Sequence, residues 1–519
     1  MRRLRTRSSR LVGLLSLAAI VATGGCGDSS SDDLASLAPP DAPLYAEVTL
    51  RPDGDQAEAI SSLADRVAGI EDPGAAIVAE LDKALAHSDA ELDYADDVEP
   101  WLGDRASVFV RSFEPSEVAD DVPDFAAAIE VDDVDAARSF LDRAAESDPD
   151  REEERSYEGF DYVVGGDQGI AAGIVDDHLV VGTERSLKVA VDASQGESLA
   201  ESEEFEDRIA ALGGDPLAMV FLEPGEVIDA TVAEQRTGPG NARFLRPVLA
   251  GPLSGPVAIG LSATRSAASL DVAALYDGSG QQASGSTLLE GLPAGSWFAA
   301  ALPDLGEPLT RLLEQLDNSG LPGAASFRRQ FRAMTGLHLR RDLLDWLGDA
   351  AIFAQGTSAP GFRAGLIAET DDPDAPRALL ERVQRFVERD SGLRSASAPE
   401  GADYGFQIGI PSLGGGAEAG VIGGRLVAVL GGTIEQVLDP PATLADDQSY
   451  RAARDALGDD LSPALYARLP TLLEVVEQDE PGPGYEAAAP YLEAFDSLIV
   501  GSRLDDGLVL ARLVVTLAQ

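Results

Sequence analysis

Trp101-Leu102-Gly103-Asp104 is the stretch that decides the fold, because the same four residues return as Trp346-Leu347-Gly348-Asp349, 245 residues further along the chain. The chain has 519 residues and three tryptophans, so chance is a poor explanation for two identical tetrapeptides built around two of them. Solenoid proteins repeat every 20 to 50 residues or so. A repeat at this much longer distance predicts two homologous halves.

The segments around the two motifs correspond as well. Each half opens with a proline-led turn that runs into an aromatic strand, Pro40–Tyr45 and Pro293–Phe298. In both halves a strand, a second strand and an acidic helix start then follow in the same order, at 106–111, 125–131 and 132–138, and at 350–355, 362–370 and 371–377. Carboxylates in a first helical turn complement the helix dipole. We interpret these acids as helix caps rather than as metal ligands.

Two further pairs of residues predict β-hairpins. Asp176-Asp177 and Gly423-Gly424 each separate two apolar runs, as a two-residue hairpin turn does. Helical segments are expected after each hairpin, and paired strands close each half; these segments are 186–193, 199–213 and 256–264 with 268–276, and 434–438, 444–458 and 498–504 with 508–517. Because hairpins outnumber helical crossovers, we predict an α+β fold of two homologous halves, each a mostly antiparallel sheet with flanking helices.

These patterns set the expected domain limits. The first α+β repeat is predicted at 38–277, a linker at 278–291 and the second α+β repeat at 292–519. The linker begins with the Gly- and Ser-rich run Gly278–Gly285, which separates the last strand of one half from the opening turn of the other. Each half is long enough to bury its own core. The repeat is compatible with two separate sheets and with one shared sheet.

The N-terminal residues predict an exported protein. Residues 1–25 have the layout of a signal peptide, with five arginines and no acid in the first ten positions and then an apolar stretch too short to span a membrane stably. Cys26 is the only cysteine, and Ala22–Cys26 resembles a lipobox, in which the cysteine is lipidated and becomes the mature N-terminus. Thr23 departs from the usual Leu or Val. The alternative is an ordinary signal with an incidental cysteine.

Residues 26–37 are accordingly predicted to be the lipidated cysteine and a polar tether. The formal charge of the whole chain is −51, and without the five N-terminal arginines it is −56, from 34 basic and 90 acidic residues. Nucleic acid binding requires a basic footprint and is excluded. The expected partner is therefore the membrane, reached through the lipid at Cys26. The acidity and the scarcity of lysine fit a GC-rich genome and also a halophilic origin.

The sequence lacks the motifs of several enzyme classes. The three histidines, His87, His178 and His338, do not have the spacing of a zinc hydrolase, and the chain has no Gly-x-Ser-x-Gly elbow and no phosphate-binding P-loop. Gly414–Gly420 is interpreted as a loop or bulge before a hairpin. No catalytic, cofactor-binding or metal-binding residue is predicted. The Trp motifs are interpreted as structural, with a buried indole, a glycine at a turn and a capping Asp.

Taken together, Cys26, the Pro40–Tyr45 opening, the two Trp-Leu-Gly-Asp motifs and the Asp132–Arg138 helix start resemble a family of envelope lipoproteins from high-GC Gram-positive bacteria, catalogued only as a domain of unknown function. The resemblance covers nearly the whole mature chain and brings no catalytic residues. It implies a lipid-anchored protein on the extracytoplasmic face of the cell membrane.

Two function classes follow from these observations. The first is a non-enzymatic lipoprotein that binds or scaffolds a component of the envelope. The alternative is an envelope hydrolase that uses carboxylates alone. A cleft with two acids of opposed pKa shifts would favour the hydrolase, and a broad apolar groove would favour the binding protein.

Overall fold

The structure is a computed structural model of the chain. It describes residues 34–86, 92–113, 123–146, 153–165, 169–225, 253–276, 286–318, 329–330, 332–333, 336–358, 360–370, 372, 374–391, 395–410, 415–477 and 483–518. These residues form two compact units. The first contains the described residues up to 225 together with Ser254–Ser266 and Leu270–Leu275, and the second contains Ala267–Ser269 and the residues from Tyr276 onward.

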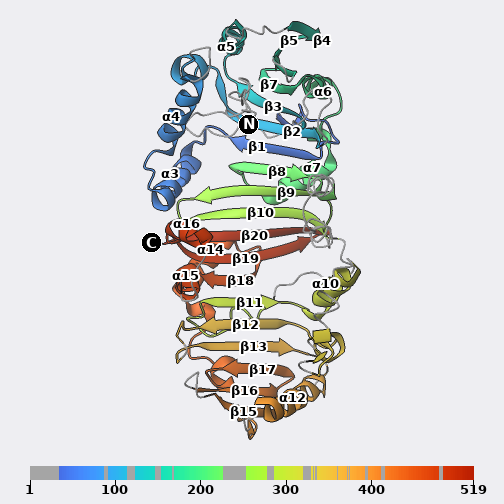
Figure 1. Ribbon diagram of the computed structural model, residues 1–519, viewed down its shortest axis with the longest axis vertical. Helices are drawn as coiled ribbons and strands as arrows, with labels where there is room; N and C mark the ends of the chain where they lie inside the picture. The colour runs from blue at the N-terminus through green and yellow to red at the C-terminus, as the bar shows by residue number, and fades with distance from the viewer. Residues whose placement is uncertain are drawn as a thin grey trace, which may run out of the picture. The chain divides into compact units, whose positions relative to one another are not determined.

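The first unit is built on antiparallel strands in the order β10-β9-β8-β1-β2-β3-β7-β6-β5-β4 (Figure 1). Their bounds are β1 Leu44–Thr49, β2 Leu102–Ser112, β3 Asp124–Val131, β4 Glu153–Tyr157, β5 Phe160–Gly165, β6 Ile170–Val175, β7 His178–Thr183, β8 Ala218–Leu222, β9 Leu253–Thr264 and β10 Ala267–Tyr276. The helical segments are α3 Gly54–Ala68, α4 Pro73–Ala86, η2 Tyr94–Val98, α5 Val134–Glu146, α6 Glu184–Gln195, η3 Leu199–Glu201 and α7 Glu203–Leu212.

The second unit repeats this strand order as β20-β19-β18-β11-β12-β13-β17-β16-β15-β14. Its strands are β11 Phe298–Leu302, β12 Ala350–Gln355, β13 Arg363–Glu369, β14 Ser395–Ala396, β15 Tyr404–Ile410, β16 Gly415–Ile422, β17 Arg425–Leu430, β18 Ser462–Arg468, β19 Phe495–Asp505 and β20 Leu508–Leu517. Its helical segments are α10 Gly306–Asn318, η5 Arg340–Leu344, α12 Asp374–Phe386, η6 Val387–Ser391, α13 Ile434–Leu438, η8 Leu444–Asp446, α14 Gln448–Leu457, α15 Leu469–Glu477 and α16 Pro483–Leu492.

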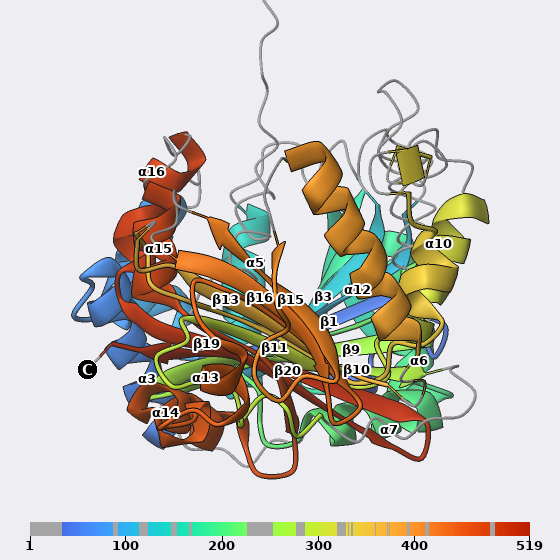
Figure 2. The ribbon, with the colours of Figure 1, turned by 90° about the horizontal axis from the view of Figure 1, so that it is seen from below.

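The α+β class is therefore confirmed, and the described strand pairs are antiparallel. In the second unit α12 and α13 lie on opposite faces of the sheet (Figure 2). Successive strand residues point to opposite faces, so the core cluster under α12 takes Ala419 and Val421 of β16, while Gly420 faces Ile434 of α13. No described helix combines the length and the apolar character needed to cross a bilayer.

Both predicted hairpin turns are confirmed. In the first unit Val175 pairs with His178, and Asp176 and Asp177 have φ values of 43° and 62°. In the second, Ile422 pairs with Arg425 across Gly423 and Gly424, whose φ values are 55° and 78°. Positive φ at both central residues is the geometry of a type I′ turn, which matches the twist of the flanking strands.

The helix caps are confirmed as well. The Asp133 carboxylate accepts hydrogen bonds from the backbone N–H groups of Asp135 and Ala136 at 3.0 Å each, and the Asp372 carboxylate accepts from Asp374 and Ala375 at 3.0 and 3.4 Å. Thr183 and Thr433 cap α6 and α13 in the same way, each through a backbone N–H three residues on. Each cap satisfies helix-start donors that have no partner within the helix.

The two Trp motifs follow single π-helical turns held by a buried aspartate. The Asp97 carboxylate accepts the N–H of Asp93 at 2.7 Å, and its carbonyl accepts the Trp101 indole N–H at 2.7 Å. In the second unit, the Asp342 carboxylate accepts the N–H of His338 at 2.8 Å, and its carbonyl accepts the Trp346 indole at 3.0 Å. Each carboxylate also forms an ion pair with an arginine of a nearby helix. Asp97 pairs with Arg143 of α5, and Asp342 pairs with Arg382 of α12.

Two expectations about these motifs need correction. Trp101 is 1% exposed, as expected, but Trp346 is only half-buried. The motif glycines allow a close strand approach rather than a turn, because a Cβ on Gly103 would lie 2.6 Å from the Cβ of Glu130, and one on Gly348 would lie 3.1 Å from the carbonyl oxygen of Glu369. Glycine is therefore favoured at both positions, because the neighbouring strand leaves little room for a side chain.

The glycine-rich run before the second hairpin is a strand over its described residues 415–420, and not the loop or bulge that the sequence predicts. Gly415 to Gly420 lie in β16 and pair in continuous register with β15, where Gly405 is opposite Gly420. A Cβ on Gly405 would lie 2.4 Å from the carbonyl oxygen of Ala419, so the two backbones approach too closely for a side chain there. The glycines therefore serve close strand packing, a role that composition alone does not distinguish from a loop.

Candidate functional site

The candidate site is in the first unit, where the β4–β5 hairpin packs against α6. Glu158 and Gly159 form the two-residue turn between these strands, with φ values of 47° and 94°. The edge strand β4 carries Glu153, Glu154 and Arg155, and charged side chains of this kind protect an edge from pairing with another chain. Arg155 pairs with Tyr162 of β5, so both side chains lie on the same face of the sheet.

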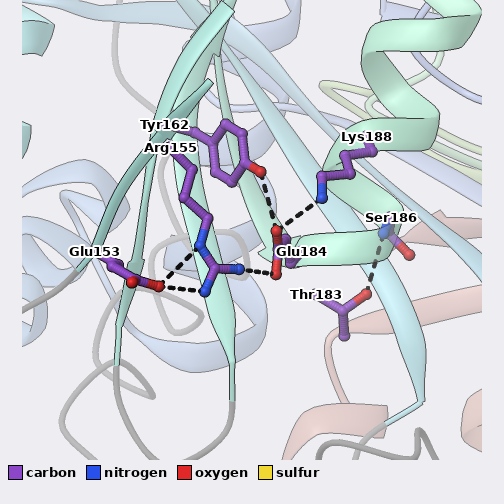
Figure 3. A network of polar contacts seen from close by, with 7 residues as sticks. All are labelled: Glu153, Arg155, Tyr162, Thr183, Glu184, Ser186 and Lys188. Carbon is purple, nitrogen blue, oxygen red and sulfur yellow. Dashed lines mark hydrogen bonds and ion pairs between the residues drawn. The ribbon is translucent and has the colours of Figure 1, made fainter. Parts of the chain in front are cut away.

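That face is joined to α6 through Glu184 (Figure 3). The Glu184 carboxylate accepts hydrogen bonds from Arg155 at 2.6 Å, Lys188 at 2.8 Å and Tyr162 at 3.0 Å. Arg155 also bonds Glu153 with two nitrogens, at 2.5 and 3.1 Å. We call Glu153, Arg155, Tyr162, Glu184 and Lys188 the Glu184 network; it fixes the hairpin against the helix.

The electrostatics of this network oppose a role in proton transfer. Burial alone would raise the pKa of Glu184, but the hydrogen bonds from Lys188, Arg155 and Tyr162 lower it to about 2. The hydrogen bond to Glu184 raises the pKa of Lys188, whose ammonium lies 5.6 and 5.8 Å from the ring centroids of Tyr157 and Tyr162. At neutral pH the acid stays ionised and the amine protonated, so neither group exchanges protons readily nor acts as a nucleophile.

A cavity of about 620 Å³ adjoins this hairpin. We call it the hairpin cavity. Its walls come from α5 and from the β4, β5 and β6 strands, and its lining residues are Arg138, Leu141, Asp142, Glu154, Arg155, Ser156, Gly159, Phe160, Asp161, Tyr162, Val163, Ala172, Gly173 and Ile174. The volume lies in the range of small-molecule sites. The lining combines aromatic and aliphatic side chains with charges of both signs, which suits a ligand with many hydrogen-bonding groups and little net charge.

A second charged cluster is buried under β1. Glu47 is 4% exposed and accepts hydrogen bonds from Tyr45 and Arg105, each at 2.7 Å, while Arg105 also bonds Asp215 at 2.5 Å. Burial raises the pKa of both Glu47 and Tyr45. A carboxyl of this kind is a typical candidate for a general acid. Glu47 does not line the hairpin cavity, however, and its carboxylate is engaged by Tyr45 and Arg105, so the cluster is best explained as part of the core.

A third cluster joins β2, β3 and α6. Asp124 is 4% exposed and accepts hydrogen bonds from Ser186 at 2.7 Å, from Arg111 at 2.7 Å and from Thr183. Burial would raise the pKa of Asp124, but these donors lower it. The carboxylate is thus held ionised by hydroxyl and guanidinium groups, which explains how a charge is tolerated at this depth.

Of the cysteine and the three histidines weighed in the sequence, only Cys26 is predicted to be a site residue. Cys26 and His87 lie outside the described residues. His178 lies beside the first hairpin turn, with its Nδ1 2.6 Å from the carbonyl oxygen of Asp176, and His338 lies in the second unit. Among the described residues, no group of three or more His, Cys, Asp or Glu side chains is placed to hold a metal ion.

Sequence reasoning missed the Glu184 network. Its members come from β4, β5 and α6, and only the hairpin brings them together. The one available signal was Lys188, since the chain contains only one other lysine, Lys83. Lys188 forms an ion pair with Glu184.

Comparisons with other proteins assign no activity to the chain. A family model described as "Protein of unknown function (DUF3352)" matches residues 11–500. No protein with a curated description matches the chain. Solved structures that match include crystal forms IV and III of TP0453, each with a TM-score of 0.26, at 11% and 12% identity; they cover 48% and 49% of this chain and 83% of TP0453 in both cases.

Proposed function

The chain belongs to this family of unknown function, and we propose that it is a lipid-anchored, extracytoplasmic protein that binds a ligand without converting it. The anchor is Cys26, the sole cysteine, which follows a signal-like segment. The ligand site is the hairpin cavity. The proposal treats the two halves as products of a duplication, for which the shared strand order and the paired Trp motifs are the supporting observations.

The observation that carries the binding role is the hairpin cavity beside the Glu184 network. The network fixes β4 and β5, so the cavity walls are held in place before a ligand arrives, which lowers the entropic cost of binding. The groups that fix them stay charged at neutral pH. Such a site is suited to recognition of a neutral or zwitterionic ligand rich in hydrogen-bonding groups.

The same geometry weighs against the hydrolase alternative. A carboxylate hydrolase needs one acid with a raised pKa next to one that stays ionised, both facing the substrate. Among the described carboxyls, burial raises the pKa of Glu47 and Asp104, and neither of them lines the hairpin cavity, while Glu184 has a lowered pKa.

The anchor is tested by mass. Intact mass of the membrane-extracted protein should give a mature N-terminus at Cys26 carrying a diacylglycerol, and Cys26→Ala should appear as unlipidated precursor or as released protein. A mature N-terminus elsewhere, without lipid, would refute the anchor and leave the cavity proposal standing.

The cavity is tested by filling it. Ser156 is exposed and lines the cavity, so Ser156→Trp should obstruct it without changing charge. Ser266→Trp, in the exposed turn after β9, is the matched control. Thermal-shift screening with envelope saccharide and peptide fragments should identify ligands that stabilise the wild type and Ser266→Trp but not Ser156→Trp. Turnover of any such ligand, or equal stabilisation of all three proteins, would contradict the proposal.

A further inference from the structure

The second unit contains a cavity that the proposed function does not use. It has a volume of about 580 Å³ and lies between α10 and the residues that lead into η5. Thr310, Leu313 and Glu314 of α10 form one wall, and Leu337 to Arg341 with Asp345 form another. Arg329 and Arg332 complete the lining. We call this the arginine cavity.

The charge of this lining is opposite to that of the chain. Four arginines line the cavity against two acids, Glu314 and Asp345, in a protein with a formal charge of −51. Both acids pair with Arg340, at 2.8 and 3.4 Å. Arg341 pairs with Asp342 at 2.8 Å. The lining acids are therefore already engaged, and the cavity keeps a local excess of positive charge.

The remaining two cations are placed to act together. Arg329 and Arg332 both have helical backbone and both line the arginine cavity. Both are exposed, and neither has an ion pair within the described part of the chain. Planar guanidinium groups bind phosphate oxygens through paired hydrogen bonds, which is why arginine is favoured for this anion.

The rest of the lining is aliphatic. Leu313 and Leu339 are half-buried, and Leu337, 6% exposed, belongs to the core cluster of this unit. A bare phosphate would leave the exposed parts of Leu313 and Leu339 facing water, whereas an attached alkyl chain would cover them. The cavity volume also exceeds what an inorganic anion fills and falls within the range for small organic ligands.

We propose that the arginine cavity binds a phosphate group carried on an aliphatic chain. Arg329 and Arg332 hold the phosphate, and the leucines contact the chain. A membrane phospholipid and a soluble lipid phosphate share this chemistry. The inference rests on the second unit alone and is independent of the Cys26 anchor and of the hairpin cavity.

The test uses calorimetric titration of the full chain with monomeric dihexanoyl phosphatidic acid, and with inorganic phosphate for comparison. The wild type should bind one lipid phosphate per chain, with an affinity that falls as salt rises, because the contact is ionic. Inorganic phosphate should bind at least ten-fold more weakly. Equal affinity for the two would overturn the aliphatic part of the proposal.

Variants assign the site. Arg329→Glu with Arg332→Glu should weaken lipid binding at least ten-fold, and Arg329→Gln with Arg332→Gln should weaken it less. The matched control is Arg185→Glu with Arg451→Glu, which makes the same charge change at exposed positions of α6 and α14 and should leave affinity within two-fold. Melting temperatures verify that each variant is folded. No lipid binding by the wild type, or the same loss in the control, would overturn the proposal.

Vesicles distinguish the two ligand sources. Flotation of unlipidated Cys26→Ala protein with phosphatidylglycerol vesicles, lost in Arg329→Glu with Arg332→Glu, would identify a membrane phospholipid. Binding of monomeric lipid phosphate without flotation would identify a soluble lipid phosphate. Each result supports the site and names its ligand.

Discussion

The π-helical turns before Trp101 and Trp346 share their hydrogen bonds, but the two indoles differ in how deeply they are buried. Trp101 is 1% exposed and packs against Phe140 of α5, with ring centroids 5.2 Å apart. Trp346 is half-buried. The helix position seven residues after the capping Asp is Phe140 in the first unit and Leu379 in the second. Leu379 belongs to the core cluster against which Trp346 packs.

The charges around the two turns differ in the same way. Asp97 receives one arginine, Arg143, whereas Asp342 receives two, Arg341 and Arg382. Local spacing thus fixes the hydrogen bonds in both units. Each packed helix supplies one arginine, Arg143 or Arg382, and the additional arginine in the second unit, Arg341, comes from η5 itself. The comparison teaches that a motif repeated in sequence can keep its geometry and still differ in the energy that it contributes.

The largest expected loss of stability comes from removing the buried indole of Trp101. Trp101→Ala should destabilise the protein by about 3–5 kcal/mol, because it opens a cavity in a closed core. Trp346→Ala should cost about half as much, since the half-buried ring leaves space that water can fill. Urea unfolding followed by circular dichroism measures both. Equal losses would contradict the difference in burial.

The buried aspartates sharpen the comparison through pH. Burial would raise the pKa of Asp342, but hydrogen bonds from Arg341, the His338 N–H and Arg382 hold it well below its usual value. The carboxylate therefore stabilises the fold above about pH 4, and the contribution is lost as pH falls toward the folded pKa.

Asp342→Asn should accordingly cost about 1–3 kcal/mol at pH 7. The loss should shrink at acid pH, because the carboxylate of the unfolded chain binds protons before the carboxylate of the folded protein does. Urea midpoints at pH 7 and pH 2.5 measure it. Arg382→Met should reproduce most of the loss and add little to Asp342→Asn. A pH-independent cost would show that the ion pairs contribute nothing beyond packing.

The helices after the two hairpins give a smaller contrast. The first residue of α6 is Glu184, held by two cations, and the first residue of α13 is the buried Ile434. With the pKa of Glu184 lowered from 4.5 to about 2, its contribution is present above about pH 4.5 and lost as pH falls toward 2.

Glu184→Gln should therefore lower stability by about 1 kcal/mol at pH 7, a modest value because the group is partly exposed. Thermal melts at pH 7 and pH 3 should show the difference narrowing. Glu435→Gln, an exposed first-turn carboxylate of α13, is the matched control and should change stability by less than about 0.5 kcal/mol. An equal effect of the two substitutions would reduce the network to a helix-dipole interaction.

The smallest effect is expected in the hairpin turns. Asp176 and Asp177 hold positive φ values that glycine adopts without strain. Asp177→Gly should raise stability by about 0.5–1 kcal/mol, and Gly424→Asp should lower it by a similar amount. A melting-temperature series of the single and combined substitutions measures both. If neither changes the melting temperature, the turns do not limit stability in either unit.

Much of the fold was predictable from local pattern. Local residues largely set the hairpin turns, the caps Asp133 and Asp372 and the strands around them. These features could therefore be predicted from short stretches of sequence. The Asp97 and Asp342 pattern was visible too, since each Asp lies four residues before its Trp, but its meaning needed the partner arginine. The glycines of β16 were misread because close strand pairing is not a local property.

The candidate site was harder to predict from the sequence than the fold was. The Glu184 network combines β4, β5 and α6, and the arginine cavity combines α10 with residues before η5. No periodicity or spacing relates these segments, because their contacts depend on how the chain returns to itself. The net charge gave no indication of the arginine cavity, because the formal charge of the whole chain is −51 although four arginines line this cavity.

Backbone preferences over a few residues set the turn and cap geometry and the α+β class, so these features could be predicted from the sequence, as could the repeated Trp-Leu-Gly-Asp element. The tertiary structure was needed to show which Trp is more deeply buried, which carboxylates are held ionised and where cavities remain. Burial and pKa depend on the groups that distant segments bring within a few ångströms, and Glu184 and Asp342 acquire their lowered pKa values from such neighbours.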